Sequence, residues 1–430
     1  MPVRVYAPVG RKPELLAYLV RRLLENGASS SFVRQAARAR DTGRLIEQAF
    51  GANGRGLAKP TELHMPERRV ARGYDLGEPG VLAETAKRVS EARRPWRAAP
   101  LVNGSSAGGP ARAVVSPARP GETIGEVVDA TAEQVHAALS HAYAARERWA
   151  AASVAVRAAG LERLADLMEA HVHELMALCV WEAGKTLPDA LADVREAIDF
   201  CRYYAAEARR LMAAPALLKS SVGESNALSL HARGVFACIS PWNFPVAIFT
   251  GQVAAALAAG NPVVAKPAGQ TPLTAFRVVQ LAHEAGIPAD VLQLLPGDGT
   301  VGQALVADAR VAGAAFTGSL ETARAIQRVL AQRDGPLVPL IAETGGLNAM
   351  IVDSTALPEQ VVDAVVASAF RSAGQRCSSL RMLYLQEEIA TDVIEMLRGA
   401  TAALRLGDPA DPATDVGPVI DVEAHRALDE

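Results

Sequence analysis

The sequence lacks the patterns of a disulfide-bonded, zinc-binding or membrane-spanning protein. Its four cysteines are far apart in 430 residues and show no CxxC spacing, which favours a reducing compartment. The longest apolar run, residues 246–259, contains Gln252 and is too short to cross a bilayer. The first residues also lack the apolar core of a signal peptide. We therefore expect a cytoplasmic protein with no transmembrane segment.

The composition also lacks an excess of one charge and is poor in aromatic residues. The net charge is −3, aromatic residues make up 5% and hydrophobic residues 50%. Without a broad basic field, attraction to nucleic acid or to a membrane surface is not expected of this chain. Its length is enough for two or three domains, each with a substantial core.

The periodicity of apolar residues changes along the chain. A short strand (residues 3–10) and an amphipathic helix ended by Gly27 come first, followed by a stretch with weak periodicity, 34–112. Strong helical patterns begin at Thr131, and one of them predicts a continuous helix over 154–184. After Gly234, short apolar runs alternate with helical segments, which predicts a doubly wound parallel sheet of the α/β class. Ligands of such sheets bind at the carboxyl ends of the strands.

Two polar stretches follow predicted strands of this sheet. In "ISPWNFP", prolines bracket Trp242 and Asn243, and an amide held there could donate a hydrogen bond to a developing oxyanion. Taken alone, the pattern favours the alternative of a proline-rich turn with an Asn that caps the next helix. In "VVAKPAGQTP", Lys266 is suited to ribose hydroxyls or phosphate, although a solvated surface lysine is as compatible with the pattern.

Glycines stand at the ends of two further predicted strands. In "AAFTGSLETA", Gly318 and Ser319 come directly before a helix, where backbone N–H groups can bind an anion. This is not a GxGxxG motif, and a simple N-cap by Ser319 remains an alternative. In "LLPGDG", Gly297 could border a nucleotide or only form a turn.

A carboxylate and a cysteine complete the set of candidates. Glu343 lies between "PLIA" and two glycines, and if partly buried its pKa would rise toward a value useful to a base; otherwise it is a turn carboxylate. Cys377 follows a predicted helix, in "AFRSAGQRCSSLR". Arg371 and Arg376 would stabilise its thiolate if they lie close. Cysteine is often buried and inert, but this segment is too polar to resemble a core.

The order of these motifs resembles the aldehyde dehydrogenase superfamily, from about Ala113 to the last residue. A second resemblance lies in "VRVYAPVG" and "LLAYLVRRLLENGASSSFV", which look like the last strand and helix of a proline dehydrogenase barrel. In that family the positions of Tyr6, Tyr18, Arg21 and Arg22 contact proline. Together the two resemble the layout of the bifunctional proline utilisation A family, of which we expect this chain to be an internal piece.

The resemblance implies a reaction and a role for each candidate. Cys377 would attack the aldehyde carbon of glutamate γ-semialdehyde, and the amide of Asn243 with the Cys377 backbone N–H would bind the oxyanion. Glu343 would activate the water that releases glutamate. NAD would accept the hydride; the residues implied to hold it are Lys266 at the adenosine ribose, Gly318 and Ser319 at the pyrophosphate, Trp242 beside the nicotinamide and Gly297 at the border of the nucleotide.

The resemblance also implies four segments. They are a remnant of the proline dehydrogenase barrel (1–33), a linker (34–112), an NAD-binding domain (113–342) and an incomplete catalytic domain (343–430). One strand and one helix cannot bind a flavin, so FAD is expected only in the complete bifunctional protein, which we also expect to be a homo-oligomer.

The chain departs from the family pattern at one position of the cofactor site. The family usually has a glutamate after "KPA", at the adenosine ribose, where this chain has Gly269. Without that carboxylate the preference for NAD over NADP is weakened.

Two other functions stay open at this stage. The first is a non-catalytic fragment that binds nucleotide weakly or contributes only to an assembly, because the later glutamate-Phe-Gly-Pro motif of the family does not occur before Glu430. The second is a cysteine hydrolase or acyltransferase, which is disfavoured because neither His283 nor His425 has a recognisable setting as a partner of Cys377.

Overall fold

The computed structural model describes residues 58–429 apart from 107, 220 and 222, and also residues 15, 16, 19 and 20. The chain divides into two compact units, 1–63 and 64–430. In the first unit, residues 15, 16, 19 and 20 are helical and Pro60–Glu62 forms a short 3-10 helix, η1. The predicted strand 3–10 and the four expected proline-contacting positions lie outside the described residues. No helix among the described residues is long and apolar enough to cross a membrane.

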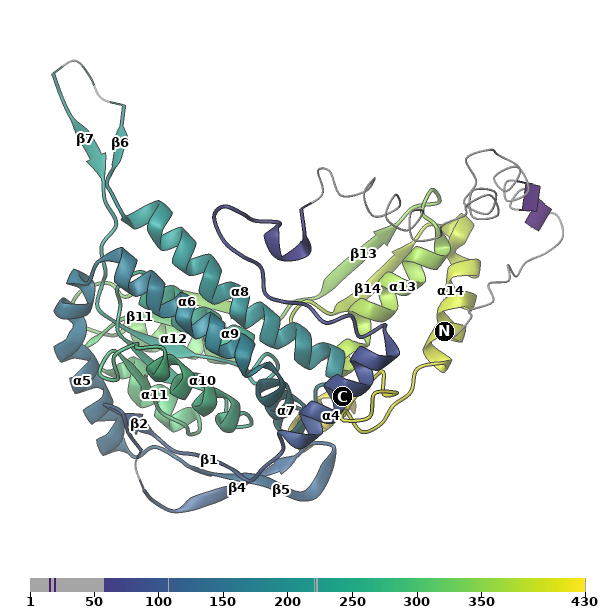
Figure 1. Cartoon of the computed structure of the whole chain (residues 1–430), viewed down its shortest axis with the longest axis horizontal. Coiled ribbons are helices and arrows are strands. Elements are labelled where there is room, and N and C mark those ends of the chain that lie inside the picture. The colour runs from purple at the N-terminus through teal and green to yellow at the C-terminus, as the bar shows by residue number, and fades with distance from the viewer. Residues whose placement is uncertain are drawn as a thin grey trace, which may run out of the picture. The chain divides into compact units, whose positions relative to one another are not determined.

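A seven-stranded sheet organises the second unit (Figure 1), with the order β12-β11-β8-β9-β10-β2-β3. The five strands from β12 to β10 are mutually parallel, whereas β2 and β3 are antiparallel to their neighbours. This confirms the predicted doubly wound α/β sheet. The strand bounds are β8 Val235–Ile239, β9 Val263–Lys266, β10 Leu292–Leu294, β11 Val311–Gly318, β12 Leu340–Thr344, β2 Leu101–Val102 and β3 Ser105–Ser106.

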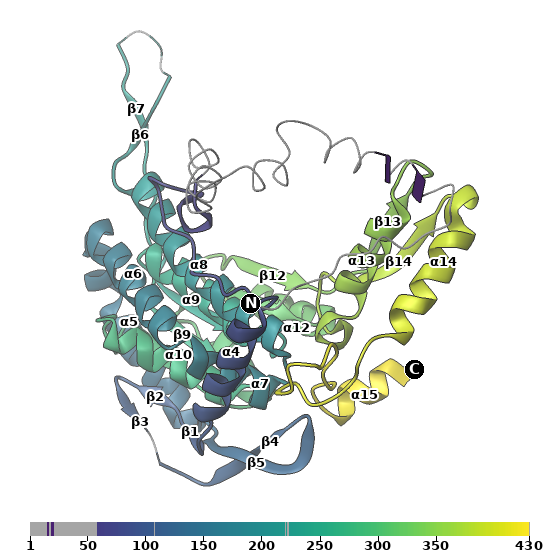
Figure 2. The same cartoon turned by 45° about the vertical axis from the view of Figure 1, so that its right-hand side comes forward.

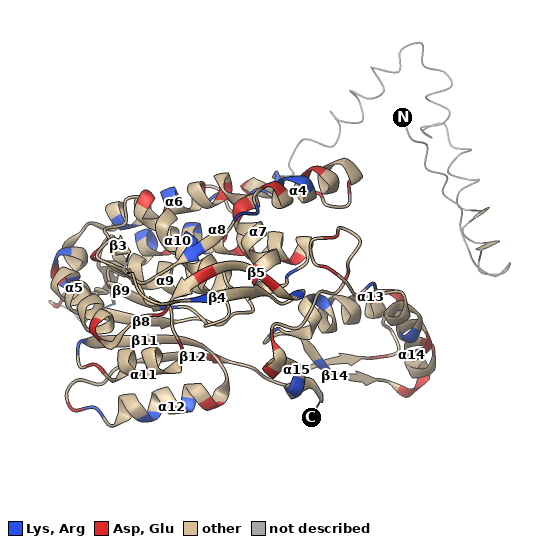
Figure 3. Cartoon of the chain, turned by 90° about the horizontal axis from the view of Figure 1, so that it is seen from below, with Lys and Arg blue, Asp and Glu red and all other residues tan. Residues whose placement is uncertain are grey.

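Helices cover both faces of this sheet, as Figure 3 shows in side view. Along β8, Ala237 and Ile239 pack into the core beside α5, α11 and α12, while Phe236 and Cys238 pack into the core beside α6 to α10. Because successive side chains of a strand point to opposite faces, a strand covered on both faces must be apolar throughout. The helix bounds are α5 Ala132–Ala151, α6 Val154–Ala170, α7 Val172–Ala183, α8 Leu187–Met212, α9 Ala247–Ala258, α10 Pro272–Glu284, α11 Gly299–Ala307 and α12 Leu320–Ala331.

The helical stretch expected after residue 153 is two helices rather than one. The chain leaves helical geometry at His171 (φ −99°, ψ 21°), which ends α6 and begins α7. Its ring bonds Glu174 in the first turn of α7 at 3.0 Å. Gly184, in the left-handed conformation with φ 66°, then ends α7 as the C-cap.

The described part of the stretch expected as a linker contains regular structure. It forms α4 (Pro79–Glu91), β1 (Trp96–Ala98) and the two strands β2 and β3 of the large sheet. β1 pairs in parallel with β5 (Arg119–Val128), which also pairs with β4 (Ala111–Ser116).

A smaller lobe follows the large sheet in sequence (Figure 2). The parallel pair β13 (Asn348–Val352) and β14 (Leu380–Leu385) packs against α13 (Pro358–Ala369) and α14 (Glu387–Ala402) around a separate core. A short 3-10 segment, η2 (Arg371–Gly374), leads from α13 toward Cys377, and α15 (Val422–Asp429) is the last described helix.

The remaining strands form a hairpin that extends beyond the end of α8 (Figure 1). Its strands, β6 (Ala216–Leu218) and β7 (Asn226–Leu228), are exposed along their whole length.

Candidate active site

The predicted site residues from β8 to β12 follow the carboxyl ends of five parallel strands. The strand register aligns these ends, pairing Ile239 of β8 with Lys266 of β9, and Thr317 of β11 with Glu343 of β12. The chain visits β8, β9 and β10 in one direction and then crosses β8 to form β11 and β12 on its other side. In such sheets the ligand crevice lies where the direction reverses, here between the ends of β8 and β11.

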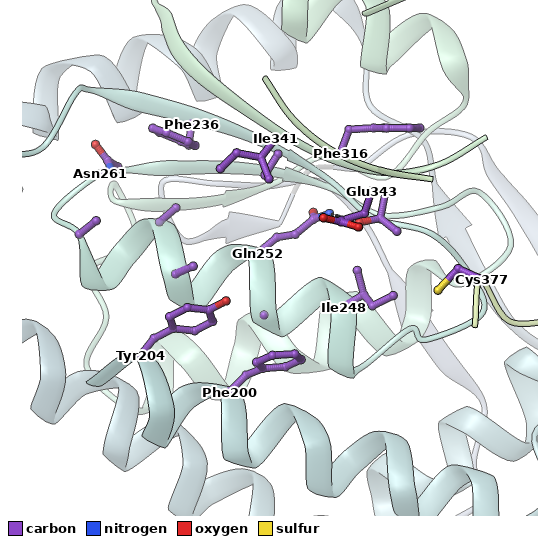
Figure 4. A pocket seen from close by; sticks show the side chains of 16 residues that line it. Phe200, Tyr204, Phe236, Ile248, Gln252, Asn261, Phe316, Ile341, Glu343 and Cys377 are labelled. Carbon is purple, nitrogen blue, oxygen red and sulfur yellow. Dashed lines mark hydrogen bonds between the residues drawn. The ribbon is translucent and has the colours of Figure 1, made fainter. Parts of the chain in front are cut away.

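Two cavities meet at the ends of β11 and β12. The strand-end cavity has a volume of about 360 Å³ and brings together six of the eight predicted residues, namely Trp242, Asn243, Gly318, Ser319, Glu343 and Cys377. The apolar cavity, of about 480 Å³, lies beside α8 and α9 (Figure 4). Thr317, Glu343 and Cys377 line both cavities, so these three residues stand at their junction.

Asn243 is tied directly to the segment that carries the cysteine. Its Nδ2 donates to the carbonyl oxygen of Gln375 at 2.9 Å, two residues before Cys377. An amide nitrogen carries two hydrogens, so one remains for a ligand oxygen. The side-chain oxygen of Asn243 is buried without a partner. Asn243 does not cap α9, because the N-cap of that helix is Val246 and lacks a side-chain cap.

Cys377 is exposed, whereas the other three cysteines, Cys179, Cys201 and Cys238, are buried. In Figure 4 its sulfur lies at one end of the apolar cavity, and Glu343 lies between Cys377 and Ile341. The Cys377 carbonyl oxygen accepts a hydrogen bond from Asn348 Nδ2 at 2.6 Å. This setting excludes the inert buried thiol that the sequence left as an alternative.

The two arginines expected near the thiol have another partner. Arg371 Nε and Arg376 each donate to Asp189 Oδ1 at 2.9 Å. Their guanidinium groups are therefore held by a buried carboxylate of α8, an arrangement that the sequence interpretation did not foresee.

Glu343 is exposed, so the partial burial considered for it from the sequence is wrong. The reason is its strand: β12 is at the edge of the sheet, and Ile341 on the same strand keeps 56% of its surface exposed. Beside it, Gln252 of α9 donates from Nε2 to Thr317 Oγ1 at 3.0 Å. Glu343 thus faces the cavity junction as a solvated carboxylate within reach of water.

Lys266 is buried, with 6% of its surface exposed, which rules out the solvated lysine considered from the sequence. Its Nζ donates to the Pro267 carbonyl at 2.7 Å. Burial lowers its pKa to about 8, although the nearby charges of Asp298 and Asp129 oppose this change. Gly269, in the loop after Lys266, lies beside Gly297, because a Cβ on Gly269 would stand 3.9 Å from the Gly297 carbonyl oxygen. Neither Lys266 nor Gly297 lines the cavities around Cys377.

Gly318 and Ser319 form the start of α12. Ser319 is its N-cap and accepts a hydrogen bond from Thr322 N at 3.1 Å, which confirms the capping role considered from the sequence. A Cβ on Gly318 would lie 2.6 Å from the Phe316 ring, so any other residue here would require that ring to shift. The bare backbone at a helix start at the switch point is compatible with a bound phosphate group as well.

Three residues at the start of α8 and just before it escaped the sequence interpretation. Asp189 and Asp193 lie in the buried stripe of α8, and Lys185 pairs with Asp193 at 3.3 Å. A usable signal was present, because carboxylates four residues apart occupy positions where an amphipathic helix normally has apolar side chains.

No histidine of the described residues lines either cavity that contains Cys377. His283 bonds the Leu292 carbonyl from α10, and His425 is on α15. This argues further against a cysteine hydrolase. The described residues also contain no cluster of three or more His, Cys, Asp or Glu that could hold a metal ion.

Two family models match this chain. The model of the aldehyde dehydrogenase family matches residues 104–430, and that of proline dehydrogenase matches residues 1–35. The first match includes all eight candidate residues.

The individual relatives agree with these matches. The bifunctional protein PutA of Escherichia coli (strain K12) is 48% identical over 448 residues, which cover 100% of this chain and 33% of that protein. A crystal structure of a mutant of Bradyrhizobium japonicum proline utilization A is 50% identical with a TM-score of 0.80, covering 99% of this chain and 41% of that one. A Thermus 1-pyrroline-5-carboxylate dehydrogenase with bound NAD is 32% identical with a TM-score of 0.79, covering 84% and 71%. The chain thus spans about a third of the length of the curated PutA relatives it matches.

Proposed function

Because the chain belongs to the aldehyde dehydrogenase family, we propose that it carries the site that oxidises glutamate γ-semialdehyde to glutamate with NAD. This semialdehyde is the open form of 1-pyrroline-5-carboxylate, the compound named for the Thermus relative. The observation that carries the proposal is the strand-end cavity, where an exposed cysteine, an amide and a carboxylate meet at the topological switch point of a parallel sheet.

The reaction begins at Cys377. Its thiolate attacks the aldehyde carbon and forms a C–S bond, while the carbonyl oxygen becomes an oxyanion. The free N–H of the Asn243 amide and the backbone N–H of Cys377 donate to that oxygen. Each such donor contributes about 3 kcal/mol to transition-state stabilisation. Loss of a hydride from the same carbon leaves a thioester on Cys377.

Glu343 completes the turnover. Its carboxylate takes a proton from a water molecule, the water oxygen attacks the thioester carbon, and the C–S bond breaks. Glutamate leaves and Cys377 is regenerated. The exposure of Glu343 at the junction of the two cavities supports this role, because water can reach it there.

The strand ends fit a dinucleotide. Gly318 gives a bare backbone at the start of α12, where the pyrophosphate would bind with Ser319, and Lys266 with Gly297 would hold the adenosine end. Trp242 would lie beside the nicotinamide. NAD supplies the hydride acceptor. NADP remains a second possible cofactor because of Gly269.

Two further properties are proposals for the complete protein. FAD would belong to the proline dehydrogenase barrel, whose last part residues 1–35 resemble. Self-association into a homo-oligomer is supported by the exposed hairpin, where Leu217 keeps 82% and Leu228 keeps 55% of its surface exposed.

Replacing the nucleophile tests the reaction. We expect Cys377→Ala to abolish aldehyde-dependent reduction of NAD, because no other cysteine of the described residues is exposed, while NAD still binds. Initial rates with the semialdehyde and calorimetric titration of NAD measure the two properties. Ser378→Ala, at the exposed neighbouring position, is the control and should keep its activity. Substantial NAD reduction by Cys377→Ala would rule out the thioester route.

A further inference from the structure

Two carboxylates of α8 connect the two halves of the reacting centre. Asp189 and Asp193 are four residues apart, so they lie on the same face of the helix, about one turn from each other. Their side chains are 1% and 0% exposed. Neither residue lines a cavity that contains Cys377, so neither touches a substrate there.

Asp189 holds the segment that leads to the cysteine. One of its carboxylate oxygens accepts from Arg371 and Arg376, and the other accepts from the backbone N–H and hydroxyl of Ser372, each at 2.9 Å. Burial alone would raise the pKa of Asp189, but the charges of Arg371, Arg376 and Lys185 hold it below its ordinary value. The carboxylate is therefore ionised and binds four donors of one short segment.

The same segment has an unfavourable backbone conformation. Ser372 (φ 55°) and Ala373 (φ 54°) are in the left-handed region, followed by Gly374 (φ 68°). Residues with a Cβ adopt this region only where surrounding contacts enforce it. The bonds from Asp189 to Ser372 supply that enforcement at the start of the left-handed turn, four to five residues before Cys377.

Asp193 holds the segment that carries the amide. Its carboxylate accepts from Ala247 N at 2.8 Å, at the first residue of α9, and pairs with Lys185. Lys185 Nζ in turn donates to the Asn243 carbonyl oxygen at 2.7 Å and lies 4.2 Å from the centre of the Phe244 ring. The turn from 243 to 247 is thus bound at both ends by one buried ion pair.

We propose that Asp189 and Asp193 are positioning residues that set the separation between the Cys377 sulfur and the Asn243 amide, with Lys185 as the link to Asn243. The inference rests on the proposed function, since that reaction needs both groups on one carbonyl. A single rigid helix, with one carboxylate for each segment, fixes both with respect to the same axis. A misplacement of about 1 Å can reduce a rate by about 100-fold, so such a device has a large effect on turnover.

Hydrogen exchange of two peptides tests whether each carboxylate holds its own segment. In Asp189→Asn we expect faster exchange in residues 369–380 and unchanged exchange in 241–250. The side-chain nitrogen of Asn is a donor, so it cannot accept the hydrogen bonds from residues 371–376 that the replaced carboxylate oxygen accepts. In Asp193→Asn we expect the reverse. Alkylation of Cys377 by iodoacetamide gives a second readout, since the other cysteines are buried. Its rate should change at least threefold in Asp189→Asn and less than twofold in Asp193→Asn.

The turnover rate of each variant is then divided by the number of Cys377 thiols that react with iodoacetamide and compared with that of the unmodified protein. We expect kcat with the semialdehyde to fall about 10- to 100-fold in both variants, with the KM for NAD changed less than about threefold. Asp189→Glu keeps the charge but moves the carboxylate by one methylene, so it should fold normally and still lose kcat. The matched control is Asp199→Asn: Asp199 is also on α8 and accepts a backbone N–H, from Ala71 at 2.8 Å, but binds no segment of the site. Its kcat should not change.

The outcomes separate this inference from the proposed function. The positioning role would be overturned if, in either Asn variant, the exchange rate rose equally in both peptides or in neither. It would also be overturned if Asp189→Glu and Asp193→Asn both kept the full kcat of the unmodified protein. If the unmodified protein does not oxidise the semialdehyde, the proposed function fails, while exchange and alkylation still decide whether the two carboxylates position the two segments.

Discussion

The central strands of the large sheet differ sharply from the strands next to Glu343 and Cys377. β8, β9 and β10 are buried at every residue, whereas β12 is exposed or half-buried throughout and β14 is largely exposed. Lys266 ends the buried strand β9, and Gly297 lies in the loop after the buried strand β10. Glu343 lies on the edge strand β12, and Cys377 lies in the loop before β14.

This difference shows where packing alone fixes a side chain. When a strand is covered on both faces, hydrophobic packing on each face fixes the position of the residue at its end. An edge strand and a loop have no such support, so their geometry depends on specific polar bonds. Asp189, bound to Ser372 and Arg376, is the strongest example of such a tie. The segment that leads to Cys377 is therefore held by the buried charge of Asp189.

The largest effect is expected from a substitution of Glu343, on the exposed strand β12. We expect Glu343→Gln to lower kcat about 100- to 10,000-fold, because the amide cannot take the proton of the attacking water. The thioester then persists, so one equivalent of reduced dinucleotide per site appears in a burst and further turnover nearly stops. Stopped-flow absorbance of the reduced nicotinamide measures both phases.

Stability should be unaffected by this change. Glu343 is exposed and has no buried partner, so the free energy of unfolding should change by less than about 0.5 kcal/mol. Glu321→Gln, on the first turn of α12 and also exposed, is the control and should keep full turnover. Repeated turnovers by Glu343→Gln at the normal rate would assign the base to another residue.

Glu182, a buried carboxylate of α7, allows a test of how burial affects stability. Its carboxylate caps α10 by accepting from the backbone N–H groups of Leu273 and Thr274 and from the Thr274 hydroxyl. Burial raises its pKa from 4.5 to about 7. Because the folded state binds this proton more tightly than the unfolded state, the contribution of Glu182 to stability falls as the pH rises from 4.5 through 7.

The neutral variant Glu182→Gln isolates this effect. Between pH 5 and pH 8, the unmodified protein should lose about 2 to 3 kcal/mol of unfolding free energy relative to the variant. Urea unfolding at several pH values measures the difference, and kcat per folded molecule should stay within about threefold. Parallel stability curves would show that the carboxyl of Glu182 titrates alike in the folded and unfolded states.

The two regions also differ in how well the sequence predicts them. The parallel sheet was predicted strand by strand, because a strand buried on both faces is a continuous apolar run that periodicity detects. The switch-point residues followed from their places at the ends of predicted strands and from the order of the motifs. Each of these signals is local in the chain, and local patterns are what a single sequence displays.

Long-range contacts were not predictable in the same way. Nothing in the local pattern around Arg371 and Arg376 indicates that their partner is Asp189, more than 180 residues earlier. The exposure of Glu343 was missed for a related reason: "PLIA" resembles a buried strand, and only the strand order reveals that β12 lies at an edge. The break at His171 was missed because the helical period continues across it.

The smallest effect is expected at Gly269, on the buried side of the comparison. A side chain fits there, since a Cβ would meet only the Gly297 carbonyl at 3.9 Å. Arg112 donates to the Gly269 carbonyl at 2.9 Å, and its guanidinium also pairs with Asp129 at 2.8 Å. At pH 7 the amine of Lys266, whose pKa burial lowers to about 8, is also charged. The charge of Lys266 attracts a 2′-phosphate, and position 269 itself supplies no carboxylate to repel it.

Gly269→Glu adds that carboxylate. We expect it to weaken NADP binding relative to NAD by about tenfold, because it repels the phosphate while accepting hydrogen bonds from ribose hydroxyls. Calorimetric titration of both dinucleotides at pH 7 measures the ratio of the two Kd values. Gly269→Gln, which has the same shape without the charge, should change this ratio less than threefold. An equal effect of both substitutions would mean that steric contact, rather than charge, governs the choice of cofactor at this loop.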